Sequence, residues 1–218
     1  MMMDSHALDA ILDTPQSSYD DSKALIERWH KKGRALYTVS PRFALTSSRE
    51  QLELASTLYH ETPDVLLQTH ISENKAEIAR ALELFPEHEN YTAIYDHYNL
   101  MGERTIYGHG IHLSEGELQR FYETGATIAH CPTSNFFIGS GLFDIRLTKQ
   151  QPRPVRVGVG TDVGGGTSFS MLQTLAEAYK MAQMRGISVN AIQGFYLATL
   201  GSAHALYIDD RVGTFKAG

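Results

Sequence analysis

The sequence predicts an α/β fold built on a parallel sheet. Short apolar runs with the composition of buried strands alternate with amphipathic helical segments along all 218 residues. No Pro-, Gly- or Ser-rich linker divides the chain, and no internal repeat is present. Two architectures remain open at this point: an open doubly wound sheet, and a (β/α)8 barrel. A complete barrel needs eight strands and typically about 250 residues, so this chain would form an incomplete one.

Five segments read as strands because they are short, apolar and rich in β-branched or aromatic residues. In chain order they cover residues 35–39, 65–69, 104–108, 126–129 and 155–160.

Helical periodicity fills the intervals between these strands. Gly33 is the expected stop of the first helix. Ser47 with Glu50, and Ser114 with Glu117, have the spacing of capping boxes and predict two helix starts. The first helix is expected over residues 20–32. Further helices are expected over residues 76–85, 170–184 and 188–200. The helix aromatics are expected in the core: Trp29, Phe121 and Tyr179.

The composition excludes several classes of protein. The chain has 42% apolar residues and a net charge of -6, which disfavours disorder and binding to nucleic acid or to an anionic membrane. No stretch approaches the roughly 18 apolar residues of a membrane span, and the first residues do not resemble a secretion signal. We therefore expect a cytoplasmic protein. The single cysteine, Cys131, reads as a buried filler, whereas ten histidines favour imidazole chemistry.

Polar residues gather where each predicted strand ends. Because the carboxyl ends of parallel strands share one face, and that face holds the active site, these residues are expected to meet at one mouth. In strand order they are Arg42, His70 with Glu73, His109, His130 with Asn135, and Asp162.

This set of residue types suits metal-assisted hydrolysis. Zinc or iron held by neutral imidazoles and a carboxylate lowers the pKa of its water from about 15.7 to about 7, and a neighbouring carboxylate then moves protons. His70 and Glu73 could supply a ligand and that shuttle. Asp162 could ligate the metal or hold the water, and His109 could orient the nucleophile or polarise the bond under attack. Histidine and carboxylate ligands suit both Zn²⁺ and Fe²⁺.

Ordered motifs give the sequence a resemblance to the amidohydrolase superfamily and, within it, to guanine deaminases. The motifs are Pro41-Arg42-Phe43, Thr69-His70-Ile71-Ser72-Glu73-Asn74, His109-Gly110, His130-Cys131-Pro132-Thr133-Ser134-Asn135 and Gly160-Thr161-Asp162. The resemblance implies an incomplete (β/α)8 TIM-type barrel, of the metal-dependent amidohydrolase kind, with about five parallel strands. It also implies one partial barrel domain over residues 1–218.

Carried over to this sequence, the resemblance implies that His70 and Asp162 are metal ligands, with Zn²⁺ or Fe²⁺ as the cofactor. Glu73, His109 and Asp162 become the catalytic residues: Glu73 is the proton shuttle, His109 positions water and substrate, and Asp162 helps to deprotonate the water. The implied reaction is hydrolysis of guanine at C2 to xanthine and ammonia, as in purine catabolism.

The resemblance also implies a substrate pocket and an oligomeric state. Arg42 donates to the purine oxo group, Phe43 packs on the ring, and His70 is the third substrate-binding residue. A small-molecule purine is the expected partner, with no nucleic acid and no membrane, and the protein is expected to be a homodimer. A related aminohydrolase or chlorohydrolase, acting on another purine, a pyrimidine or a chlorinated triazine, is the alternative within the class.

One departure separates this sequence from the pattern that the resemblance implies. Family members hold the metal with four protein ligands, two of them in a His-x-His pair, and no such pair lies upstream of His70. We therefore expect the chain to correspond to the central half of a longer enzyme. We expect it, as given, to be catalytically inactive, and a non-catalytic interaction module is the alternative from another class.

Overall fold

The computed structural model describes residues 1–149 and 152–216, and within them it contains a five-stranded, all-parallel sheet. The strands are β1 (Thr38–Val39), β2 (Leu66–Ile71), β3 (Thr105–His109), β4 (Thr127–His130) and β5 (Arg156–Val159). Each of the five lies on a segment that the sequence predicted as a strand, with ends that differ by at most three residues. The predicted α/β fold is confirmed.

The strand order distinguishes the two architectures that the sequence left open. The order is β1-β2-β3-β4-β5, so each strand pairs with its neighbours in the chain. A doubly wound sheet reverses its order at a switch point, and this sheet does not. Among the described strands β1 and β5 do not pair with each other, so the sheet is open. This is the arrangement of an incomplete (β/α)8 barrel.

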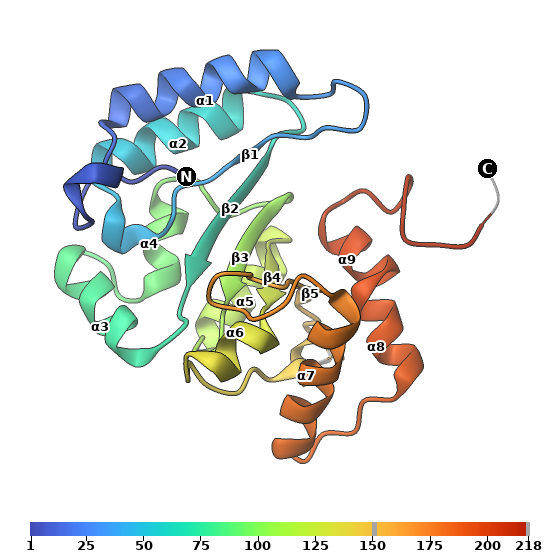
Figure 1. Cartoon of the computed structure of the whole chain (residues 1–218). Coiled ribbons are helices and arrows are strands. Elements are labelled where there is room, and N and C mark those ends of the chain that lie inside the picture. Colours follow the sequence, from blue (N-terminus) through green and yellow to red (C-terminus); the bar gives the residue numbers. More distant parts are fainter. Residues whose placement is uncertain (150–151, 217–218) are drawn as a thin grey trace.

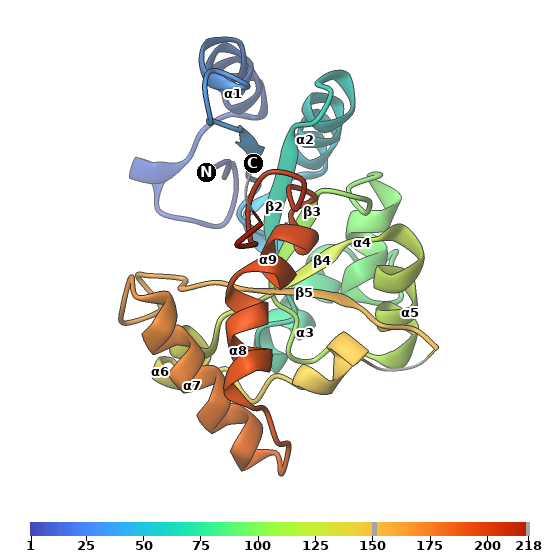
Figure 2. The same ribbon diagram turned by 90° about the vertical axis from the view of Figure 1, so that its right-hand side faces the viewer.

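Helices connect successive strands and cover the sheet. Figure 1 shows α1 and α2 side by side at one end of the molecule, with α7, α8 and α9 at the other, beside β5. Figure 2, turned by 90°, shows α8 and α9 again next to β5. The α-helices are α1 (Pro15–Trp29), α2 (Arg49–Glu61), α3 (Lys75–Leu84), α4 (Tyr91–His97), α5 (Glu115–Thr124), α6 (Pro132–Phe137), α7 (Met171–Met184), α8 (Ala191–Ala198) and α9 (Leu200–Ala205). Short 3-10 turns are η1 (Asp9–Ile11), η2 (Ala44–Thr46) and η3 (Ile145–Lys149). None of the described helices is long and apolar enough to cross a membrane.

A row of aromatic rings fills the core between the sheet and α4 and α5. The Tyr95 ring stacks on Tyr91 at 5.5 Å and lies 5.4 Å from Tyr107, which in turn lies 5.1 Å from Phe121. All four side chains are fully buried. Since each buried aromatic ring removes a large apolar area from water, this row fixes α4 and α5 against β3.

Two of the three helix aromatics expected in the core lie at the surface instead. Phe121 is fully buried, but Trp29 and Tyr179 are 49% and 50% exposed. Helical periodicity places these two side chains on the face shared with apolar neighbours. It does not say whether another element covers that face.

Two predicted helix starts are corrected by the capping contacts. The first helix begins at Pro15, five residues before the predicted start, because Thr14 and Ser17 form a capping box there. It ends at Trp29, before the predicted stop at Gly33. The cap of α2 is Ser48, whose hydroxyl accepts from the Gln51 amide. The predicted cap at Ser114 of α5 is confirmed.

Three helical features escaped the sequence-based prediction. Helices α4 and α6 are only seven and six residues long, too short for a clear amphipathic period. The predicted last helix, residues 188–200, is two helices that meet at Thr199, whose φ and ψ of -122° and -101° interrupt it. Helix α6 matters most for function, because it follows β4 directly at the edge where the polar residues meet.

Candidate active site

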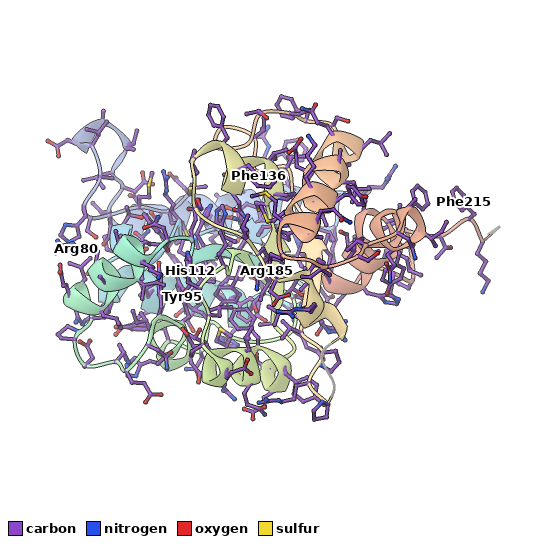
Figure 3. All side chains as sticks on the ribbon, turned by 90° about the horizontal axis from the view of Figure 1, so that it is seen from below. Arg80, Tyr95, His112, Phe136, Arg185 and Phe215 are labelled. Carbon is purple, nitrogen blue, oxygen red and sulfur yellow. The ribbon has the colours of Figure 1, made fainter. Side chains whose placement is uncertain are left out.

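The predicted strand-end residues lie at one edge of the sheet. The register pairs Ile71 with His109 and His130 with Val159, so β2 to β5 end at nearly the same level. His70 lies in β2 and His109 is the last residue of β3. Asp162 follows three residues after the end of β5. Figure 3 is the view from the side toward which the β2 arrow points in Figure 1.

His70 presents one free ring nitrogen toward this edge. Its Nδ1 donates to the backbone carbonyl of Arg42 at 2.7 Å, which leaves Nε2 with its lone pair. Burial lowers the pKa of His70 below its ordinary value, so the ring is neutral at pH 7. On the neighbouring strand, a Cβ on Gly108 would lie 3.2 Å from the His70 ring. A side chain at position 108 would therefore crowd the His70 ring, and the glycine leaves that space open.

His109 lies against His70 and is also held through Nδ1. The two rings stack with centroids 5.5 Å apart, and His109 is 2% exposed. Its Nδ1 lies 2.9 Å from Oδ1 of Asn135, an acceptor that selects the tautomer with the proton on Nδ1. Its Nε2 lies 3.5 Å from Glu73 Oε2 and 3.8 Å from Asp162 Oδ2. The second ring nitrogen of His109 therefore faces the two carboxylates.

His70, His109 and Asp162 together fit a divalent metal. One ligand atom from each of them lies within 4.8 Å of the others, and they form the one such group among the described residues. Two neutral imidazoles and a carboxylate are donors that zinc and iron accept. In both histidines the ring nitrogen away from the centre donates to an oxygen, as metal-binding histidines do in proteins. The sequence predicted that His109 orients water and substrate and is not a metal ligand. Its Nε2 lies close enough to the other two ligand atoms to serve as a ligand as well.

Glu73 lies next to this group and has a different environment. Its Oε1 accepts a hydrogen bond from Ser140 Oγ at 2.7 Å, and its backbone amide donates to Glu77 Oε2 at 2.9 Å. The side chain is 18% exposed. A carboxylate that is largely buried, close to His109 and outside the metal group is suited to carry protons.

Residues at three of the strand ends adopt a left-handed backbone conformation. Ser72, His109 and Asp162 have φ of 50°, 70° and 45°. Such conformations are uncommon for residues other than glycine and cluster at functional sites. Here the conformation turns the chain at the end of β3 and shortly after the ends of β2 and β5.

Arg42 and Phe43 lie at the outer side of the site. Arg42 is exposed and Phe43 is half-buried. The guanidinium carbon of Arg42 lies 5.4 Å from the Phe43 ring centroid, and that ring meets His70 edge-on at 6.4 Å. The structure thus places all six predicted site residues around one mouth: Arg42, Phe43, His70, Glu73, His109 and Asp162.

Other residues near the mouth have structural surroundings. His130 is buried and stacks on Phe143 at 4.6 Å, and its burial lowers its pKa to about 3. Burial raises the pKa of the Cys131 thiol to about 12, so this cysteine is no nucleophile at neutral pH.

Comparison with known proteins decides the family. The sequence profile of the amidohydrolase family matches residues 2–218. This chain belongs to the amidohydrolase family. The resemblance that the strand-end motifs carried is therefore confirmed.

Relatives of this amidohydrolase include guanine deaminases. The chain is 51% identical to the guanine deaminase of Escherichia coli (strain K12), over 100% of this chain and 49% of that protein. The solved structure of E. coli guanine deaminase matches 100% of this chain and 51% of its own chain, with a TM-score of 0.97. A guanine deaminase from C. acetobutylicum with bound guanine in its active site is 29% identical, with a TM-score of 0.88, over 100% of this chain and 52% of its own. The chain spans about half the length of the curated relatives it matches.

Sequence reasoning assigned no role to three residues that hold the amidohydrolase site. Asn135 and Ser140 contact His109 and Glu73. The buried hydroxyl of Tyr95 accepts from the Ala44 amide at 3.0 Å and donates to the His70 carbonyl at 2.8 Å. Asn135 was expected at the mouth but without a role, whereas nothing in the sequence distinguishes Ser140 or Tyr95 from other serines and tyrosines.

Proposed function

We propose that this protein catalyses the metal-dependent hydrolytic deamination of guanine to xanthine and ammonia. The observation that carries the proposal is the approach of two carboxylates to one buried histidine, His109. Glu73 Oε2 and Asp162 Oδ2 lie 3.5 Å and 3.8 Å from His109 Nε2, beside the free ring nitrogen of His70. Guanine as the substrate is supported by the relatives, one of which holds guanine in its active site.

The metal, proposed to be zinc, would be held by His70 and Asp162, with His109 as a neighbouring donor. When bound, it lowers the pKa of a water and supplies a nucleophile at neutral pH. Asp162 accepts a proton from the attacking water. His109, fixed by Asn135, orients that water and the carbon under attack. Iron would suit the same donors.

Glu73 moves the protons that the reaction requires. Water adds its oxygen to C2 of guanine and the amino group leaves as ammonia, so the ring nitrogen and then the departing amine must each gain a proton. Glu73 lies next to His109 but outside the metal group, where it can take a proton from the water side and release it to the substrate. Arg42 donates to the oxo group and Phe43 packs on the purine ring.

A substrate panel tests the proposal. The protein is purified as its own cells express it, loaded with Zn²⁺ and supplied with guanine, adenine, cytosine or a chlorinated triazine. We expect ammonia release to be fastest with guanine, with xanthine as the co-product. Glu73→Gln should lower kcat by about 10²- to 10⁴-fold, while Arg80→Ala, on the outer face of α3, should leave it unchanged. Faster turnover of another substrate, or no turnover at all, would reject guanine deamination.

The 218-residue chain by itself is expected to be a poor catalyst. Its described residues offer three ligand atoms at the site, whereas the resemblance implies four protein ligands. Affinity depends on ligand number and geometry. We therefore expect metal to bind this chain weakly, and little xanthine to form. Rapid ammonia release by the isolated chain with Zn²⁺ and guanine would contradict this expectation.

Homodimer formation and a cytoplasmic location are also part of the proposal. Large apolar side chains are exposed on α6 and at the start of α7, which favours association; they are Phe137, Ile138, Phe169 and Leu172. Light scattering should give twice the chain mass, and a monomer at micromolar concentration would contradict the dimer. The net charge of -6 supports the expectation that nucleic acid is not a partner.

A further inference from the structure

Ser140 lies opposite Glu73, in the turn that follows α6. Its hydroxyl donates to Glu73 Oε1 at 2.7 Å. Ser140 itself is 9% exposed, so this hydrogen bond is sheltered from water. The bond occupies one carboxylate oxygen and leaves the other, Oε2, 3.5 Å from His109 Nε2.

The backbone of Ser140 is held on both sides. Its amide donates to the Asn135 carbonyl at 3.0 Å, and its own carbonyl accepts from His112 Nε2 at 3.1 Å. The flanking Gly139 and Gly141 have φ of 73° and 136°, a backbone that other residues rarely adopt. A Cβ at Gly141 would lie 3.1 Å from an Ile111 methyl carbon. The position of the hydroxyl is therefore set by the fold.

His112 connects this turn to the strand end that carries Glu73. The Ser72 carbonyl accepts from the backbone amides of both Ile111 and His112 at 3.1 Å. The His112 ring then reaches the Ser140 carbonyl. Glu73 is thus fixed twice relative to Ser140: once through its own side chain, and once through the backbone beside it.

The segment from Asn135 to Ser140 contacts two catalytic groups in the same way. Asn135 holds the Nδ1 side of His109, and Ser140 holds the Oε1 side of Glu73. In each case the atom that faces away from the centre is occupied and the other atom is directed inward. A proton carrier needs this control, since a misplacement of about 1 Å can cost about a hundredfold in rate.

We propose that Ser140 is a positioning residue for Glu73, which fixes the carboxylate so that Oε2 faces His109 and the substrate. This inference rests on the proposed function, because it assigns the role of Ser140 through the proton transfers of Glu73. Ser140 touches neither the metal group nor the guanine-binding residues. Its loss therefore affects proton transfer and leaves substrate binding intact.

The experiment compares Ser140→Ala, Ser140→Thr and a control, Ser18→Ala, in structure and in kinetics. Ser18 is a buried serine on α1 whose hydroxyl also faces a carboxylate, Asp13 Oδ2 at 3.4 Å, far from the site. We expect crystals of Ser140→Ala to show the Glu73 carboxylate turned away from His109. In Ser140→Thr, which keeps the hydroxyl, and in Ser18→Ala it should stay in place.

In guanine turnover, Ser140→Ala should lower kcat by about tenfold to a hundredfold with KM unchanged, and Ser140→Thr should restore most of it. An unmoved Glu73 in Ser140→Ala, or a kcat equal to that of the unaltered protein, would overturn the proposal. If the unaltered protein, purified in the form that its own cells express, turns over no guanine, the proposed function fails. The crystal structures alone then decide whether Ser140 positions Glu73.

Discussion

The Nδ1 atom of His109 lies 2.9 Å from the Oδ1 atom of Asn135, across the gap between β3 and α6. This contact directs the other ring nitrogen of His109 toward Glu73 and Asp162. A residue of α6 thus determines which atom of a residue on β3 faces the chemistry.

Replacing Asn135 tests that relationship. Asn135→Ala removes the acceptor and frees the His109 ring to rotate or change tautomer. We expect metal affinity or guanine turnover to fall by about 10- to 100-fold, as for other residues that orient a ligand from behind. Competition titration with a chelating dye measures the affinity. Asn190→Ala, which removes the cap of α8 away from the site, should leave the affinity unchanged, and an equal loss in both variants would refute the account.

Tyr95 should stabilise the fold through its hydroxyl. Tyr95→Phe leaves the Ala44 amide and the His70 carbonyl without that buried partner, so the free energy of unfolding should fall by about 1–3 kcal/mol. Urea unfolding measures it. Tyr122→Phe, at an exposed position on α5, should change it by less than about 0.5 kcal/mol. Equal stability of Tyr95→Phe and the unaltered protein would show that the hydroxyl contributes nothing.

Burial of His130 should make the protein less stable in acid. Its pKa falls to about 3 in the folded state, whereas in the unfolded chain it is about 6.5. Between these values the unfolded state binds a proton that the folded state does not, so stability decreases as pH falls from about 6.5 toward 3.

The variant His130→Leu should reduce that dependence on pH. Removing one such proton lowers the slope by up to about 1.4 kcal/mol per pH unit. Urea unfolding of both proteins at pH 7, 6 and 5 gives the slopes. Identical slopes would mean that His130 takes up its proton equally in both states.

Arg42 should contribute to guanine binding rather than to chemistry. Arg42→Ala removes a charged donor to the oxo group, worth about 1.5–3 kcal/mol, so KM for guanine should rise by about 10- to 100-fold with little change in kcat. Arg80→Ala removes an exposed arginine paired with Glu83 at 2.9 Å and serves as the control; Arg80 lies at the periphery in Figure 3. A fall in kcat at constant KM would place Arg42 in the chemical step instead.

The strands and their polar ends could be predicted because both follow from short-range patterns. Apolar runs fix the strands, and parallel pairing then brings residues as distant as His70 and Asp162 to one edge. The short helix α6 could not be predicted in this way. Asn135 was expected at this edge but without a role, and Ser140, in the turn after α6, was not singled out. Their roles depend on where one hydroxyl and one amide point, which is a property of the packed turn.

The sequence also did not predict which apolar side chains of the helices are exposed. The residues Trp29 and Tyr179 have the spacing of core positions but are half-exposed. A period of 3.6 identifies the apolar face of a helix, but it carries no information about whether another element covers that face.

The most direct test of the central claim is a metal titration of the 218-residue chain, of His70→Ala and of Glu73→Gln. We expect one Zn²⁺ per chain, bound measurably in titration although too weakly to survive dialysis. His70→Ala should weaken the affinity at least about tenfold, while Glu73→Gln, outside the metal group, should keep one Zn²⁺ per chain. No saturable binding, or the same affinity in His70→Ala as in the unaltered chain, would contradict the metal site at the ends of β2, β3 and β5.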